Sequence, residues 1–145
     1  MDKGLSVSVV IITLNRADWL KDALMSLTKQ SRPPDEVVVV DNGSKDHTKE
    51  IALSFSDRLP LRYIYEAVKG IPFARNTGVR NATGDIVAFI DDDSVADEDW
   101  LKYMEIPFVK DPHVGAVGGE KTYYRMGKGY IEAFFMENMK LSSRE

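Results

Sequence analysis

Residues 7–16 read VSVVIITLNR, and this stretch decides the fold. The first six residues are β-branched except for one serine, a pattern typical of a strand that is buried on both faces of a parallel sheet. The run then ends in TLNR, where asparagine and arginine replace the apolar side chains. Directly afterwards, apolar residues recur at helical spacing and predict a helix with one face on the sheet; these are Leu20, Ala23, Leu24 and Leu27.

The same unit of strand and helix repeats along the chain. Strands are predicted at residues 36–40, 61–65 and 86–90, and helices at residues 47–55 and from Pro72 onward. A further helix begins near Trp100, and Pro107 should end or kink it. We also expect a fifth strand at residues 114–117, a short extension at residues 121–125 and an apolar helix at residues 130–139. This alternation predicts an α/β fold with a mainly parallel sheet and helices on both faces.

Composition narrows the functional classes. The chain has 145 residues, 43% of them hydrophobic, which suits one globular domain. A net charge of −4 shows no basic footprint and argues against nucleic acid as a partner. With no cysteine and only two histidines, disulfides, thiolate zinc sites and histidine-rich metal sites are excluded. The apolar run near the start is too short to span a membrane, so we expect a cytoplasmic protein.

Polar residues follow the predicted strands where ligands bind in open parallel sheets, outside the carboxyl ends of the strands. The first, second and fourth strands end in TLNR, DNGS and DDD, at residues 13–16, 41–44 and 91–93. The glycine-rich fingerprints of dinucleotide and P-loop sites are absent from the sequence. Three adjacent carboxylates repel one another, and a hard cation such as Mg²⁺ or Mn²⁺ would relieve that repulsion. The alternative is a solvated acidic turn before the next helix.

Five segments, taken in order, resemble the family 2 glycosyltransferases. They are SVVIITLNR at 8–16, DNGSKDHT at 41–48, ARNTG at 74–78, TGD at 83–85 with the strand to DDD, and VGAVGG at 114–119. The resemblance implies a Rossmann-like GT-A fold and a nucleotide-diphosphate sugar, UDP-linked, as the donor. It also implies Mn²⁺ or Mg²⁺ as cofactor and inverting transfer to a hydroxyl of a saccharide or lipid-linked saccharide.

The resemblance assigns residues of the nucleotide-sugar site by position. Thr13, Asn15 and Asp41 would line the pocket for the base and ribose, and Arg75 would reach the base or the phosphates. Arg16 belongs to the same nucleotide-sugar site. The competing interpretations are a turn acid at Asp41, a helix cap at Asn15 and a solvated helix residue at Arg75.

The acidic triplet matches the DxD motif of that family. Asp93 would bind the metal, and Asp91 would lie near the ribose or the metal. Asp92 fills the variable position and is expected within the nucleotide-sugar site. Asn42 departs from the pattern, because the family often has a second acid there, and we expect this change to be tolerated.

The end of the chain departs further from the family. We expect residues 1–119 to form the donor-binding subdomain and residues 120–145 to begin an incomplete acceptor-side region, with the catalytic base beyond residue 145. The chain would then be truncated relative to the whole enzyme. Its apolar tail would favour self-association or peripheral contact with the inner face of a membrane.

Two alternative functions belong to classes other than glycosyl transfer. One is a nucleotide-sugar-binding module without turnover, since no acid lies in the context of the family's base. The other is a haloacid dehalogenase-type phosphatase, because DDDSV at residues 91–95 fits DxDx[TV] after a buried strand. That motif usually opens its fold, whereas here three units of strand and helix precede it.

Overall fold

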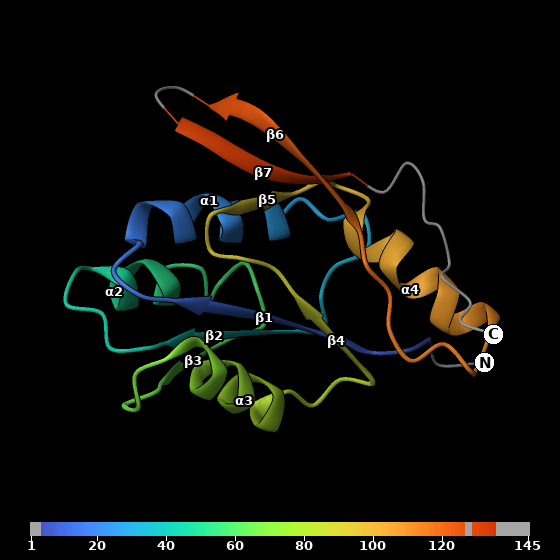
Figure 1. Cartoon of the computed structure of the whole chain (residues 1–145), viewed down its shortest axis with the longest axis horizontal. Coiled ribbons are helices and arrows are strands. Elements are labelled where there is room, and N and C mark those ends of the chain that lie inside the picture. Colours follow the sequence, from blue (N-terminus) through green and yellow to red (C-terminus); the bar gives the residue numbers. More distant parts are fainter. Residues whose placement is uncertain (1–3, 127–128, 136–145) are drawn as a thin grey trace.

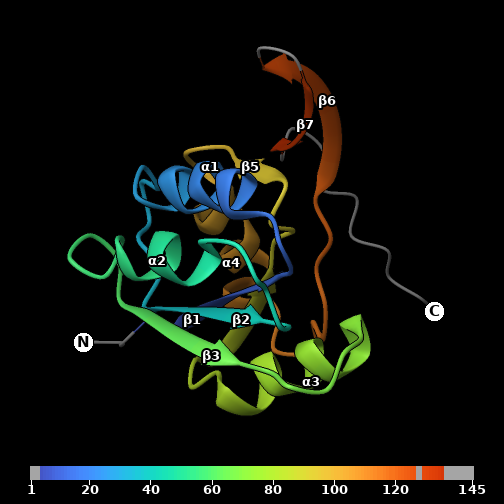
Figure 2. The same ribbon diagram turned by 90° about the vertical axis from the view of Figure 1, so that its left-hand side faces the viewer.

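The computed structural model describes residues 4–126 and 129–135, and within them a four-stranded parallel sheet forms the centre of the fold. Its strands are β1 (Val7–Thr13), β2 (Glu36–Asp41), β3 (Leu61–Tyr65) and β4 (Ile86–Phe89), in the order β3-β2-β1-β4. The helices are α1 (Ala17–Leu27), α2 (Thr48–Leu53), α3 (Ile71–Asn81) and α4 (Trp100–Lys110). Helix α3 covers one face of the sheet and α1 and α2 cover the other, as Figure 1 and Figure 2 show. The predicted α/β fold is confirmed.

Alternate side chains of the central strands build a core on each face. Val9 and Ile11 of β1 join the larger core, together with Leu20 and Leu24 of α1. Val10, between them in sequence, joins a smaller core on the face of α3. Burial on both faces explains why β1 and β2 are almost continuously apolar.

The segment after α4 differs from the prediction. Residues 114–117 form no strand; residues 115–119 instead line a cavity of about 480 Å³ together with β4 and with Trp100 and Phe108 of α4. Pro107 does not end α4, which continues to Lys110.

The predicted helix at residues 130–139 is also wrong where the structure describes it. Strand β7 (Gly129–Phe135) pairs with β6 (Glu120–Met126) in an antiparallel hairpin and with the short parallel strand β5 (Ser94–Ala96). Residues 136–139 lie outside the described residues. The hairpin stands apart from the main sheet, beyond α1 and β5 (Figure 1).

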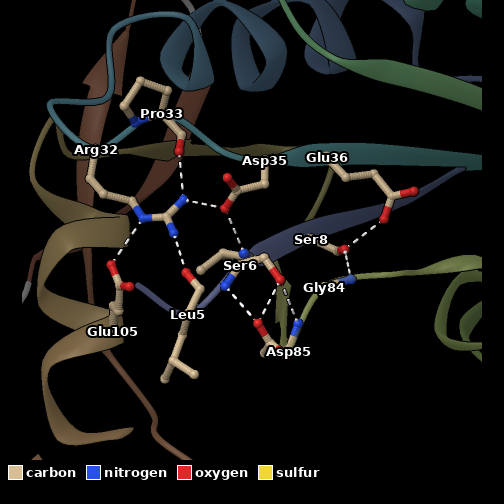
Figure 3. Close-up of polar contacts among 11 residues, drawn as sticks. Leu5, Ser6, Ser8, Arg32, Pro33, Asp35, Glu36, Gly84, Asp85 and Glu105 are labelled. Atoms are coloured by element: carbon tan, nitrogen blue, oxygen red, sulfur yellow. Dashed lines mark hydrogen bonds and ion pairs between the residues drawn. The ribbon is translucent and has the colours of Figure 1, made fainter. Parts of the chain in front are cut away.

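A polar network holds the amino end of the sheet (Figure 3). The Arg32 guanidinium donates to Glu105 of α4 at 2.9 Å, to Asp35 at 2.8 Å and to the Leu5 carbonyl at 2.6 Å. Glu36 accepts a hydrogen bond from the Ser8 hydroxyl at 2.6 Å. These side chains connect the amino-terminal ends of β1 and β2 to each other and to α4. The polar residues at the carboxyl ends of the strands lie at the opposite edge of the sheet and form a separate set of contacts.

Candidate functional site

The strand order reverses between β1 and β4. The chain passes from β1 outward to β2 and β3, and then returns to the other side of β1 as β4. Ligands of open α/β sheets bind at such a switch point, beyond the carboxyl ends of the strands. A cavity of about 490 Å³ opens there, lined by residues at or after the carboxyl ends of all four strands: Ile12, Thr13, Leu14, Arg16, Asn42, Lys69, Gly70, Ile71, Arg75, Asp91, Asp92 and Asp93.

The acidic triplet meets a cation in this cavity. Nη1 of Arg16 lies 3.2 Å from Oδ1 of Asp92 and 3.0 Å from Oδ2 of Asp93. Asp92 is buried, and this burial raises the pKa of its carboxyl group, while Arg16 acts in the opposite direction. The Asp93 side chain is 41% exposed and therefore accessible from the cavity. The triplet is thus not a fully solvated turn: one acid is buried and two of them share an arginine.

The carboxylates suit a hard divalent cation that takes few protein ligands. Across residues 4–126 and 129–135, no group of three or more acidic or histidine side chains is arranged to hold a metal ion. Mg²⁺ and similar cations are commonly held by one or two carboxylates, with the remaining ligands supplied by water and substrate phosphates. Asp93 offers such a carboxylate at the cavity wall. The donor set therefore fits a metal that binds together with a phosphorylated ligand.

Two further cations line the cavity from the side of α3. The Arg75 guanidinium carbon lies 5.8 Å from the centre of the Phe89 ring, at the end of β4, in the geometry of a cation–π contact. Lys69 lies in the segment that leads to α3. Arg16, Lys69 and Arg75 thus give the cavity positive charge beside its acids, an arrangement that suits an anionic ligand bound through a metal.

Asn42 organises the segment between β3 and α3. Its amide nitrogen donates to the carbonyls of Glu66 at 3.1 Å and Val68 at 2.8 Å, and its amide oxygen accepts from the Gly70 N–H at 2.8 Å. Gly70 has φ +134°, which L side chains rarely adopt. From the sequence, Asn42 is expected only as a tolerated departure from the family pattern, and Lys69 is not among the predicted site residues. The position of Asn42 directly after a strand-end acid was the available signal for its role.

The structure brings the predicted site residues together only in part. Thr13, Arg16, Arg75 and the three acids line the cavity, whereas Asn15 and Asp41 are not among its lining residues. The Asn15 amide oxygen accepts from the Lys45 N–H at 2.7 Å. The predicted roles of these residues in binding a nucleotide stay predictions.

Asp41 is buried at the end of β2 and has its own partners. Its carboxylate accepts from the Tyr63 hydroxyl at 2.7 Å and from the Ser44 N–H at 2.8 Å. Burial and the Asp41 carboxylate raise the pKa of Tyr63, so this phenol stays a hydrogen-bond donor at neutral pH. The geometry shows Asp41 as an acceptor that shapes the loop after β2.

Comparison with known sequences identifies relatives that match most of this chain. A sequence profile described as Glycosyl transferase family 2 matches residues 8–143. Glycosyltransferase AglE of Haloferax volcanii is 40% identical over 142 residues, which are 93% of this chain and 46% of that protein. The chain therefore spans less than half the length of this relative. In the described residues, no helix is both long and apolar enough to cross a membrane.

Comparison with solved structures also identifies similar proteins. A mannosyltransferase from Pyrobaculum calidifontis, in complex with GDP-Man and Mn²⁺, is 33% identical with a TM-score of 0.75, covering 83% of this chain and 37% of that one. TarS of S. aureus, in complex with UDP, is 30% identical with a TM-score of 0.68, covering 73% of this chain and 32% of that one.

Proposed function

The chain belongs to glycosyl transferase family 2, and from this premise we propose that it binds the nucleotide-sugar donor of a metal-dependent glycosyltransferase. In the proposed reaction the sugar passes from a nucleoside diphosphate, UDP in our preferred case, to an acceptor hydroxyl with inversion. One observation carries the proposal: the cavity at the strand switch point joins an accessible carboxylate to three cationic side chains.

The charges around the cavity suit a diphosphate. Asp93 would hold Mn²⁺ or Mg²⁺, and the bound metal would stabilise negative charge on the departing diphosphate. Arg75, supported by the Phe89 ring, would donate to the phosphates or the base. Lys69 extends the positive wall on the same side.

The remaining predicted residues take the nucleoside side of the donor. Thr13 lines the cavity at the end of β1, and we assign it to the base and ribose pocket together with Asn15 and Asp41. Asp91 would lie near the ribose or the metal. Asp92 is buried and would act through Arg16 rather than through direct contact.

The acceptor and the catalytic base remain predictions. Inverting transfer needs a base that takes the proton of the acceptor hydroxyl while that oxygen attacks the anomeric carbon. We place that base outside the residues that form the cavity, and we propose a saccharide or lipid-linked saccharide as the acceptor. The family match favours this reaction over the phosphatase alternative.

Titration calorimetry tests the donor site. UDP should bind in the presence of Mn²⁺ and about tenfold more weakly in EDTA, because the metal joins the diphosphate to Asp93. Asp93→Asn should remove most of this dependence on Mn²⁺. Asp57→Asn, an exposed acid after α2, is the matched control and should bind as the unchanged chain does.

Two further measurements separate the alternatives. GDP in place of UDP tests the choice of nucleotide, since the solved relatives bind one or the other. Release of sugar from a UDP-sugar in the presence of acceptors separates an enzyme from a binding module. A folded chain that binds neither nucleotide with Mn²⁺ would refute the proposed donor site.

A further inference from the structure

We propose that Arg16 is a built-in counter-cation that occupies the metal position until a nucleoside diphosphate arrives, and that it thereby makes divalent cation and nucleotide bind cooperatively. The inference rests on the proposed function and adds a coupling residue to it. It concerns the side chain of Arg16 alone and can be tested without turnover.

The geometry places Arg16 where a cation would bind. A single nitrogen, Nη1, reaches both Asp92 and Asp93, at 3.2 Å and 3.0 Å. These two carboxylates come from adjacent residues at the end of β4, whereas Arg16 follows β1. A metal ion held by Asp93 would therefore lie close to a positive guanidinium, and the two cations would repel each other.

Burial makes a counter-cation necessary at this place. Asp92 has only 6% of its surface exposed, so its negative charge is costly unless a positive partner lies beside it. Arg16 supplies that partner in the structure. A divalent cation on Asp93 would also place positive charge beside Asp92, so Arg16 and the metal compete for the Asp93 carboxylate.

Arg16 is also free to move toward a new partner. Its side chain is 51% exposed and lines the same cavity as the cations Lys69 and Arg75. A diphosphate bound between these residues would offer oxygens that a guanidinium can contact in pairs. Transfer of Arg16 from Asp93 to the diphosphate would release the carboxylate for the metal.

This exchange predicts a thermodynamic coupling. Metal alone binds weakly because it must displace Arg16, and nucleotide alone binds weakly because the acids still hold Arg16. When both ligands are present, each removes the obstacle to the other. By linkage, the factor by which Mn²⁺ improves UDP affinity equals the factor by which UDP improves Mn²⁺ affinity.

The experiment measures Mn²⁺ and UDP separately and together. Electron paramagnetic resonance gives the affinity for Mn²⁺ without nucleotide, and calorimetry gives the affinity for UDP in EDTA and in excess Mn²⁺. Arg16→Met should bind Mn²⁺ alone about fivefold or more tightly than the unchanged chain. The improvement of UDP affinity by Mn²⁺ should shrink by a similar factor.

Two further variants test whether the positive charge at position 16 is the cause of the effect. Arg16→Lys keeps the positive charge and should keep Mn²⁺ affinity within about twofold of the unchanged chain. Arg75→Met removes a cation of the same cavity, one whose guanidinium lies over the Phe89 ring. It should weaken UDP binding without tightening Mn²⁺ binding. Thermal unfolding of each variant confirms that it is folded under the conditions used.

The outcomes distinguish this inference from the proposed function. Unchanged or weaker Mn²⁺ binding in Arg16→Met, in a chain that still binds UDP with Mn²⁺, would overturn the role of Arg16 and leave the donor site standing. Equal tightening in Arg16→Lys and Arg16→Met would also overturn it, because charge would not be the cause. Failure of the folded, unchanged chain to bind Mn²⁺ and UDP together would overturn both.

Discussion

At the scale of single residues, Asn42 shows how one side chain can fix a site that it also lines. Its amide group donates twice and accepts once, and all three bonds go to the backbone between β3 and α3. That backbone carries Lys69 and leads into the helix that presents Arg75. An acid at this position could accept from Gly70 but could not donate to two carbonyls.

We therefore predict that Asn42→Asp lowers both stability and nucleotide affinity. The aspartate would leave the Glu66 and Val68 carbonyls facing a negative charge in a buried position, at a cost of about 1–3 kcal/mol in the free energy of unfolding. UDP affinity should fall because the segment at residues 66–70 loses its anchor. Urea unfolding and calorimetry measure the two effects.

Asn15→Asp is the matched control for this prediction. The Asn15 amide oxygen accepts from the Lys45 N–H at 2.7 Å, and a carboxylate oxygen accepts equally well. Stability should change by no more than about 0.5 kcal/mol. Equal losses in the free energy of unfolding of the two variants would show that added negative charge, rather than lost donors, is responsible.

At the scale of elements, the packing of α3 on the sheet depends on a glycine within the helix. A Cβ atom at Gly78 would lie 2.4 Å from Cγ1 of Val10 in β1, so the helix approaches the strand too closely for any larger residue. Alanine is ordinarily favoured over glycine in a helix by about 1 kcal/mol. The close contact reverses the sign of that preference here.

We predict that Gly78→Ala destabilises the chain by about 1–3 kcal/mol, through overpacking between α3 and β1. Urea unfolding gives the value. Val10→Ala removes the methyl group that the new Cβ would meet, so the double variant should lose less stability than the two single variants added together. Strict additivity would contradict the contact. Gly115→Ala, with nothing within 4 Å, is the control for the glycine change itself.

The individual strands and helices differ in how well the sequence predicts them. Strands β1 and β2 were predicted because each is a short, almost continuously apolar run that is buried on both faces. The β6–β7 hairpin was not, because an apolar run such as GYIEAFF does not by itself distinguish a helix from a strand. Pairing of β7 with β5 and β6, a long-range contact, decides the outcome.

The candidate site was predicted less completely than the fold. Strand-end position identified the acids, Arg16 and Thr13, because parallel strands deliver their carboxyl ends to one edge. It could not show that Asp41 bonds to Tyr63 or that Asn42 lines the cavity. Those details depend on the rotation of side chains at the ends of the strands and on contacts with β3 and the segment after it.

At the scale of the whole molecule, buried and bonded carboxylates make stability depend on pH. Burial by itself would raise the pKa of Asp35 and Glu36, but hydrogen bonds reverse this. The Val7 N–H and Arg32 lower the pKa of Asp35, and Ser8, Thr83 and Arg62 lower that of Glu36. Both acids lie at the amino end of the sheet, where they connect β1 and β2 to their neighbours (Figure 3).

The sign of the effect follows from proton binding. A carboxyl group whose pKa is lower in the folded chain binds fewer protons there than in the unfolded chain, so protonation favours unfolding. The stabilisation is complete above the unfolded pKa of about 4 and is lost as the pH falls through the folded value. Asp92 has a raised pKa and acts in the opposite direction, whereas Asp35, Glu36 and Asp46 all have lowered values.

We predict that the free energy of unfolding falls steadily below about pH 5, and that Glu36→Gln makes this fall shallower. Glutamine would turn an amide nitrogen toward groups that donate hydrogen bonds to Glu36, so the variant should be less stable at pH 7. Because glutamine cannot titrate, the variant should also lose less free energy of unfolding on acidification. Urea unfolding at pH 7, 5, 4 and 3 measures both quantities. Asp57→Asn, an exposed acid, should keep the slope of the unchanged chain. An identical slope in Glu36→Gln would mean that other acids carry the pH dependence.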